Sequence, residues 1–276
     1  MKNVLITGCR SGFGMLTAVA AARAGHRVFA GLRELSSGDT LARAAEGLPV
    51  HPLQLDVTAP EQREAAVSQI EADWGGVDAL VNNAGIALGG PLEELDEDEL
   101  RRQFEVNVFA VWALTNRVLP HMRNKAGGCV VNVSSMAGRT ALPFLGAYAA
   151  SKHALSGMTE ALRHEVGPFG IRVVLIEPGP YKTDIFERNR RVARRARGLE
   201  GPYAELKAMV ERAAARVDAQ SGDAQEVADR IVRVLEDAQP APRYPMGPNT
   251  RLRRLARALL SDRLYDRLVM EVLRRA

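Results

Sequence analysis

Short apolar runs alternate with longer stretches of helical character along most of this chain. The apolar runs occupy residues 4–7, 27–33, 50–55, 77–81, 129–133 and 171–176. Strands that alternate with helices are joined by right-handed crossovers, which bring the strands together in parallel. The order therefore predicts an α/β fold in which helices cover both faces of a doubly wound parallel sheet.

Length and composition favour one domain. The chain has 276 residues, of which 46% are hydrophobic and 25% charged, and no linker or repeat divides it. A chain of this size can enclose one substantial core. We expect a single domain over residues 1–276, in which residues 184–276 supply a substrate lid and C-terminal helices.

Targeting signals and cysteine patterns point to the cytoplasm. The first apolar run is too short for a signal peptide, and no segment approaches the ~20 apolar residues of a membrane span. The two cysteines, Cys9 and Cys129, form neither a metal-binding pattern nor a disulfide framework. We expect a cytoplasmic protein with no metal site and no integral membrane span.

The basic residues are unevenly distributed. The net charge is +4 and the isoelectric point is near 9.3, which could indicate nucleic-acid binding. The excess arginine lies in residues 188–197 and 251–275 and is not interleaved with aromatic residues, as it would be on a single-strand binding surface. Solvated helix faces account for these arginines, so we expect no nucleic-acid partner.

A glycine-rich turn follows the first apolar run and leads into an alanine-rich helical stretch that ends near Ala24. A strand, a glycine turn and a helix in this order can bind phosphate, because glycine lets the backbone approach a pyrophosphate and the helix N-terminus offers free N–H groups. A glycine turn alone is a weak signal, but its place after the first strand predicts a Rossmann-like dinucleotide site. The turn residues expected to contact the dinucleotide are Gly8, Arg10, Ser11, Gly12, Phe13 and Gly14.

The end of the second apolar run bears on the choice between NAD(H) and NADP(H). Folds that prefer NAD place an acid there to hold the ribose 2′-hydroxyl, whereas a 2′-phosphate requires arginine. This chain has Leu32-Arg33, with a further cation, Arg10, in the glycine turn. We expect NADP(H), although both arginines could simply be solvated. Glu34, the next residue, keeps NAD(H) open as the alternative.

Tyr148 and Lys152 lie four residues apart, and such residues are neighbours on a helix surface. A tyrosine that exchanges protons near neutral pH needs its pKa lowered by roughly three units from about 10. A cation about 5 Å away contributes on the order of 3 kcal/mol to that shift at an effective dielectric near 20. Alone, the pair could be an accidental pair on a helix surface. Ser135, just after the apolar run 129–133, can bring a hydroxyl to the same place.

The glycine turn, the tetrapeptide Asn82-Asn83-Ala84-Gly85 and the spacing of Ser135, Tyr148 and Lys152 together resemble the short-chain dehydrogenase/reductase family. The resembling motifs extend over residues 4–184. The resemblance implies an active site of Ser135, Tyr148 and Lys152 with Asn107, whose local helix distortion holds a water beside the lysine. It also implies cofactor contacts by Asp56, Val57, Asn83, Ala84, Gly85, Tyr148, Lys152, Pro178, Gly179 and Thr183. Asp56 could equally be only a turn residue.

The resemblance further implies an NADP(H)-dependent oxidoreductase that interconverts an alcohol and its ketone or aldehyde. Tyr148 would donate the proton during reduction and Ser135 would hydrogen-bond the substrate oxygen. Lys152 would lower the pKa of the tyrosine and bind the nicotinamide ribose. The rival interpretations are a member that senses NADP(H) without catalysis, and a module that binds a membrane or a partner through its basic tail.

The segments expected to form the wall of the substrate pocket are apolar. Residues 143–145 and 181–186 favour a lipophilic alcohol or carbonyl compound as substrate. Residues 29–33 and 178–183 resemble the hydroxysteroid and retinol dehydrogenase branch of the family. We also expect a homodimer or a homotetramer.

The last third of the chain is expected to be largely helical. We expect one or two basic amphipathic helices over residues 185–219, interrupted at 198–202, then a helix over 223–238, a short strand at 243–245 and helical segments from Asn249 onward. Six arginines between residues 188 and 197 should repel one another and pack poorly, so we expect a mobile lid over residues 186–202. A permanently ordered helix paired with acids elsewhere is the alternative. Leucines at helical spacing in the tail indicate packing against the domain or a partner subunit, while the arginines leave peripheral contact with an anionic membrane open.

Overall fold

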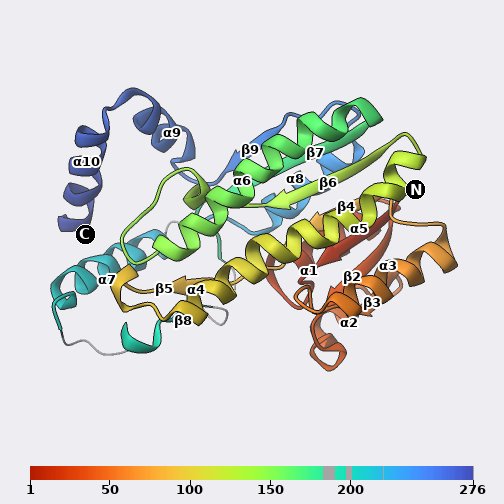
Figure 1. The fold of residues 1–276 in the computed structure, drawn as a ribbon, viewed down its shortest axis with the longest axis horizontal. Coiled ribbons are helices and arrows are strands. Elements are labelled where there is room, and N and C mark those ends of the chain that lie inside the picture. The colour runs from red at the N-terminus through yellow and green to blue at the C-terminus, as the bar shows by residue number, and fades with distance from the viewer. Residues whose placement is uncertain (183–189, 197–200, 220, 276) are drawn as a thin grey trace.

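A seven-stranded parallel sheet forms the centre of the computed structural model, which describes residues 1–182, 190–196, 201–219 and 221–275 (Figure 1). The strand order is β3-β2-β1-β4-β6-β7-β9, and every neighbouring pair is parallel. The strands are β1 (Asn3–Thr7), β2 (Arg27–Leu32), β3 (Val50–Gln54), β4 (Ala79–Asn82), β6 (Gly128–Val133), β7 (Ile171–Pro178) and β9 (Arg243–Met246). The predicted doubly wound parallel sheet is confirmed.

Helices cover both faces of this sheet, as expected for strands whose side chains alternate between the faces. In β1, Val4 and Ile6 belong to one apolar cluster and Leu5 to the other. The first cluster includes residues of α1 (Gly12–Arg23), α2 (Asp39–Ala44) and α8 (Gln225–Glu236). The second includes residues of α3 (Pro60–Trp74), α5 (Ala110–Asn124) and α6 (Gly146–Val166). The chain therefore folds as a single Rossmann-like domain with two apolar layers.

The strand order reverses beside β1, whose neighbours are β2 on one side and β4 on the other. In open parallel sheets, ligands bind outside the carboxyl ends of the strands where the order reverses, because the flanking crossovers leave on opposite faces there. The glycine turn after β1 and residues 83–85 after β4 both lie at this point. The topology thus places the predicted dinucleotide site at the carboxyl edge of the sheet.

Residues 190–196 do not form an α-helix, contrary to our expectation for 185–219. Residues Arg190–Val192 form a short strand, β8, which pairs in parallel with β5 (Ala87–Gly89), and Arg194–Ala196 form a single 3₁₀ turn. The edge of β5 offers unpaired backbone groups, and the amide of Ala193 extends this pairing by donating to the carbonyl of Gly89 at 2.9 Å. Helix is confirmed for the later part of this segment as α7 (Ala204–Ala219).

The C-terminal part follows its predicted pattern. Helix α8 and strand β9 agree with the expected helix 223–238 and strand 243–245 to within two residues. Two helices, α9 (Thr250–Leu259) and α10 (Asp262–Arg274), then form an arm that extends from the body of the domain and ends next to α7 (Figure 1). Among the helices in the described part of the chain, none combines the length and apolar character needed to cross a membrane.

Candidate active site

The glycine turn after β1 is folded so tightly that two of its positions exclude a side chain. Gly8 has a φ of +72°, and a Cβ there would lie 2.9 Å from the Cα of Ala84. At Gly14, a Cβ would lie 2.3 Å from the carbonyl oxygen of Gly8. Helix α1 begins at Gly12, so its free N–H groups face the region that this turn encloses. This is a backbone cradle for a phosphate group.

Thr7 and Asn83 fasten the glycine turn to the end of β4. The Thr7 hydroxyl accepts hydrogen bonds from the amides of Asn83 and Ala84 at 3.0 and 2.9 Å. The Asn83 side chain donates to the carbonyls of Thr7 and Gly8 at 2.9 and 3.2 Å. The Asn82 side chain instead donates to Thr115 of α5 and to Asn132 of the neighbouring strand β6. The two loops expected to contact the cofactor are therefore held as one rigid unit.

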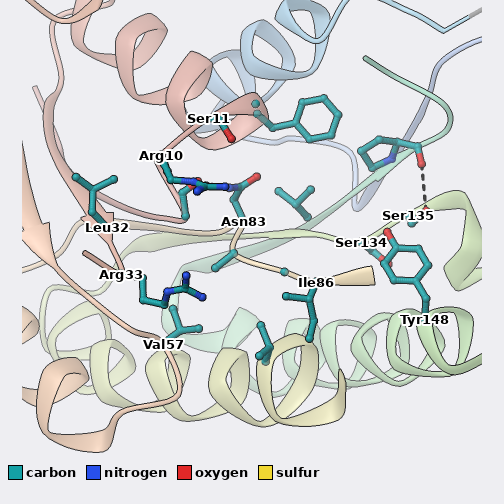
Figure 2. A pocket seen from close by; sticks show the side chains of 18 of the residues that line it. Arg10, Ser11, Leu32, Arg33, Val57, Asn83, Ile86, Ser134, Ser135 and Tyr148 are labelled. Carbon is teal, nitrogen blue, oxygen red and sulfur yellow. Dashed lines mark hydrogen bonds between the residues drawn. The ribbon is translucent and has the colours of Figure 1, made fainter. Parts of the chain in front are cut away.

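Two arginines enter the same region of the cleft from different loops. Arg10 comes from the glycine turn and Arg33 from the end of β2, and both line the cleft together with Leu32 and Val57 (Figure 2). Arg33 lies 3.6 Å from Glu34, and both side chains are mostly exposed. An exposed pair of this kind interacts only weakly, so Glu34 does not neutralise this basic region. Arginine side chains are suited to binding a phosphate group, and this cleft contains two of them.

Asp56 lies in the wall of the cleft as a carboxylate held by its own turn. Its Oδ1 accepts hydrogen bonds from the backbone amide and the hydroxyl of Thr58, at 2.9 and 2.7 Å. Burial opposes ionisation, but these two hydrogen bonds lower the pKa of Asp56 overall. Asp56 thus stabilises its own turn, as expected for a turn residue, and it also lines the cleft, where a cofactor contact was expected.

Asn107 lies in a distortion of a long helix that extends from Glu97 to Asn124. The helix consists of α4 (Glu97–Phe104), a π-helical turn (Glu105–Phe109) and α5. A π-helical turn shifts the backbone hydrogen bonds away from the α-helical pattern and is frequent at functional sites. The Asn107 side chain is fully buried; it accepts from the Ile86 amide and donates to the Ile86 carbonyl, both at 3.0 Å.

Gln103, one turn before Asn107, makes a similar set of contacts. Its side chain accepts from the amide of Leu88 at 2.8 Å and donates to the carbonyl of Ile86 at 2.9 Å. Both amide side chains also donate to the hydroxyl of Ser151 on α6, at 3.4 Å from Gln103 and 3.1 Å from Asn107. Neither Gln103 nor Ser151 is predicted as a site residue from the sequence. The sequence signals that could have identified them are the position of Gln103 four residues before Asn107 and the position of Ser151 directly before Lys152.

Ser135, Tyr148 and Lys152 converge at the other end of the cleft. Ser135 follows β6, while Tyr148 and Lys152 lie one turn apart in the first half of α6. A hydrogen bond joins the Ser135 hydroxyl and the Tyr148 phenol. The Ser135 hydroxyl also donates to the carbonyl of Pro178 at 3.4 Å (Figure 2). Lys152 Nζ donates to the carbonyl of Val133 at 2.9 Å and lies 5.8 Å from the centre of the Tyr148 ring.

Burial shifts the pKa values of Tyr148 and Lys152 in opposite directions, because it favours the neutral form of each side chain. Burial raises the pKa of Tyr148 to about 12, and the hydrogen bond with Ser135 only partly offsets this effect. Burial lowers the pKa of Lys152 to about 8. Our expectation that Lys152 sets a low pKa for Tyr148 is therefore wrong for the protein alone. Loss of solvation outweighs the attraction of a cation whose nitrogen is turned toward the Val133 carbonyl.

Most of the predicted site residues line one continuous cleft. The residues that do so are Gly8, Arg10, Ser11, Gly12, Phe13, Arg33, Asp56, Val57, Asn83, Ala84, Gly85, Ser135, Tyr148, Lys152, Pro178 and Gly179. Gly14 and Asn107 support the cleft from behind. A Cβ on Gly85 would lie 3.3 Å from Asn107 Oδ1 and 3.7 Å from Lys152 Nζ, so Gly85 borders both groups. Thr183 lies outside the described residues.

The cleft has further lining residues that the sequence analysis did not identify. Among them are Ser37, Ile86, Arg102 and Val106, whereas Arg191, which also lines the cleft, belongs to the segment expected to form the lid. Arg102 and Val106 share a helix face at i and i+4, and this spacing next to Asn107 is the signal that could have found them. Residues 143–145, expected in the pocket wall, are not among the described lining residues. The Phe144 ring instead contacts the Tyr203 ring edge-on, with 6.4 Å between their centres.

A comparison with known families agrees with this geometry. The family profile described as short chain dehydrogenase matches residues 2–194, more than half of the chain. The chain belongs to the short-chain dehydrogenase family. The matched residues include Ser135, Tyr148 and Lys152, so the resemblance predicted from the sequence motifs is confirmed at the level of the family. Members of this family are oxidoreductases, and the enzyme class is settled to that extent.

Three relatives and one solved structure show how close the likeness is. A 3-ketodihydrosphingosine reductase of Bacteroides thetaiotaomicron is 40% identical over 69% of this chain and 67% of its own length. An NADPH-dependent 3-dehydrocapnine reductase of Ornithobacterium rhinotracheale is 31% identical over 100% of this chain and 98% of its own. Human 17-beta-hydroxysteroid dehydrogenase type 1 is 39% identical over 67% of this chain and 58% of its own. A short-chain dehydrogenase from Streptomyces avermitilis has a TM-score of 0.79 and 35% identity, covering 91% of this chain and 90% of that one.

Proposed function

We propose that this protein is an NADP(H)-dependent oxidoreductase that interconverts a lipophilic alcohol and its ketone or aldehyde. The observation that carries the proposal is the convergence of Ser135, Tyr148 and Lys152 at one end of a cleft that has a phosphate cradle and two arginines at the other end. A proton donor and a dinucleotide site in one cleft are what hydride transfer to a carbonyl requires.

The residues divide the work of reduction among them. Bound NADPH would supply the hydride. Tyr148, which is protonated at neutral pH because burial raises its pKa to about 12, donates the proton to the substrate oxygen. Ser135 orients that oxygen by a hydrogen bond. Lys152 would bind the nicotinamide ribose, and Asn107, which lies in the π-helical turn, would hold a water that returns the proton to the site.

The preference for NADP(H) rests on Arg10 and Arg33. An acid at the end of β2 would bind a ribose 2′-hydroxyl, whereas the first residue after β2 here is arginine. Arg10 and Arg33 both line the cleft, so together they can hold a 2′-phosphate. The NADPH dependence in the name of the relative from Ornithobacterium rhinotracheale supports the same choice.

The substrate class rests on the relatives and on the character of the chain near the cleft. The three relatives are named for a sphingoid base, capnine and a steroid, all of which combine a carbonyl or hydroxyl group with an extensive hydrocarbon part. Phe13 and Tyr181 pack edge-on with 5.7 Å between ring centres and place aromatic surface in the cleft wall. We therefore place the substrate among lipophilic ketones and their alcohols.

We also propose that the protein acts in the cytoplasm as a homodimer or homotetramer. Phe109 and Trp112 lie three residues apart and each exposes more than half of its side chain. Large exposed apolar side chains on one helix face favour a subunit interface. Light scattering on the purified protein should give a mass of two or four chains, and a monomer at micromolar concentration would contradict this part of the proposal.

A substrate panel tests the function directly. Purified protein is mixed with NADPH or NADH and with 3-ketodihydrosphingosine, a steroid ketone, a long-chain aldehyde, a sugar and an acyl thioester ketone, and cofactor oxidation is followed by absorbance. We expect turnover with one or more of the first three substrates, and faster turnover with NADPH than with NADH. Turnover confined to the sugar or the thioester would overturn the substrate class, and the absence of any oxidation would overturn the enzymatic function.

A further inference from the structure

Helices α9 and α10 expose a series of apolar side chains. In α9, Leu252, Leu255 and Leu259 follow the spacing of one helix face, as do Leu264, Leu268 and Val272 in α10. These six side chains are between 42% and 74% exposed. Among the large apolar residues of the two helices, the buried one is Leu273. The arm thus presents apolar stripes to the solvent, although its sequence has the amphipathic pattern of packed helices.

The arm also carries the excess positive charge of the chain. Residues 250–275 contain eight arginines and three acidic residues, a net charge of +5, while the chain as a whole has a net charge of +4. The rest of the chain is therefore close to neutral. In α9, Arg253, Arg254 and Arg257 lie beside the leucine stripe, and all three are exposed. The helix thus combines an apolar face with a cationic one.

Specific contacts hold the arm in this conformation. Arg257 pairs with Asp262 at 2.7 Å across the bend between α9 and α10, and its guanidinium lies 5.3 Å from the centre of the Tyr265 ring. Arg216 on α7 donates to the carbonyl of Arg275 at 2.6 Å and anchors the end of α10. The apolar stripes are therefore displayed on an ordered support.

From these observations we infer that the arm formed by α9 and α10 is a docking surface for an anionic phospholipid bilayer. Exposed leucines can enter the boundary between headgroups and acyl chains while the flanking arginines meet the negative surface potential. A second copy of this chain would bring two such cationic arms together, and like charges would oppose that contact. Nucleic acid would engage the arginines but leave the leucines in water. A bilayer satisfies both parts of the surface.

The place where the arm joins the domain connects this surface with the cleft. Thr250, the first residue of α9, lies close to Gly179. A Cβ added to Gly179 would be 3.3 Å from Thr250 Cγ2. Gly179 lines the cleft. Docking would therefore bring this side of the cleft to the membrane, where a lipophilic substrate resides. This consequence for substrate delivery rests on the proposed function, whereas the docking itself does not.

Vesicle sedimentation tests the inference without substrate or cofactor. The full-length protein is mixed with vesicles of phosphatidylcholine alone, or with about one third phosphatidylglycerol. We expect at least tenfold more bound protein on the anionic vesicles, and a large decrease in about 0.5 M salt. The double variant Leu255→Asp/Leu259→Asp and the double variant Arg253→Glu/Arg254→Glu should each lose at least tenfold in binding. A matched control, Arg23→Glu/Arg43→Glu, makes the same change in net charge on exposed residues of α1 and α2 and should bind like the parent.

Each other outcome would overturn the inference. Equal binding of the control and arm variants would mean that net charge alone attracts the protein. If the leucine variant lowers the oligomeric mass and the parent binds no vesicles, the arm is a subunit interface. Binding of the parent to duplex DNA with unchanged affinity in the leucine variant would assign the arm to nucleic acid. Circular dichroism and NADPH titration of each variant establish that the domain is folded, so failure of docking is distinguishable from failure of the proposed enzymatic function.

Discussion

Burial dominates the protonation of the residues at the reactive end of the cleft. Lys152 is almost completely buried and its pKa is lowered to about 8, while burial raises the pKa of Tyr148 to about 12. From the i and i+4 spacing alone, we expected the cation to dominate. The difference arises because spacing along a helix places two side chains near each other but does not show how much water surrounds them.

The lysine makes a testable contribution to stability as a function of pH. Its pKa is about 8 in the folded protein, and the ordinary value of 10.5 applies in the unfolded chain. Between pH 8 and pH 10.5 the unfolded chain therefore binds more protons than the folded protein, so folding stability rises with pH. The free energy of unfolding of the parent, minus that of Lys152→Met, should therefore increase from pH 8 to pH 10.5, by up to about 3 kcal/mol. Urea unfolding at a series of pH values measures it, and a pH-independent difference would contradict the burial argument.

Arg33 is predicted to determine the choice of cofactor. Replacing Arg33 by Asp removes a cation and adds a charge that repels a 2′-phosphate, so NADPH affinity should fall by about tenfold or more while NADH affinity changes little. Fluorescence titration of both cofactors measures the effect. Arg23→Asp, the same charge change on an exposed arginine of α1, is the control and should leave both affinities unchanged. If the parent binds NADH as tightly as NADPH, the assignment of the arginines is wrong.

The segment 190–196 is held more firmly than its sequence indicates. Arg194 pairs with Asp96 at 2.8 Å, donates to Asp98 at 3.0 Å, and its amide donates to Glu99 at 3.0 Å. These acids lie at the N-terminus of α4, where their negative charges also interact favourably with the helix dipole. Ala193 is fully buried. The expectation that mutual repulsion keeps this part loosely packed is wrong, because the acids that compensate it lie about one hundred residues earlier in the sequence. The other parts of the expected lid, residues 186–189 and 197–200, lie outside the described residues.

We propose that these contacts form the latch of a lid that opens for the substrate. Arg194→Ala should then increase amide hydrogen exchange in residues 190–196 by about threefold to tenfold, in keeping with the small free energy of exposed ion pairs. Arg195→Ala is the matched control, since Arg195 makes no ion pair with another described residue. Equal exchange in both variants would remove the latch. Slow exchange across 186–202 in the free parent, unchanged by NADPH and substrate, would rule out a lid.

At the scale of the whole molecule, the alternation of apolar runs and helices was sufficient to predict the sheet, its parallel strands and the position of the cleft. The reason is that right-handed crossovers leave few ways to order such strands. The pairing of β5 with β8 was not predictable in the same way, because three-residue strands have no clear pattern and their partner is distant in the sequence. Nor were the hydrogen bonds of Gln103 and Ser151, since they depend on contacts between α4 and α6 that the sequence does not specify.

Turnover of the Tyr148→Phe variant shows whether Tyr148 donates a proton while NADPH reduces a lipophilic ketone. The substitution removes only the phenol oxygen, so the packing of the ring in α6 should be kept. We predict that kcat with the best substrate of the panel falls by about 10² to 10⁴, the usual contribution of general acid catalysis, while NADPH affinity stays within about threefold of the parent. A variant that turns over within about threefold of the parent rate would contradict the account, because general acid catalysis by Tyr148 would then contribute almost nothing.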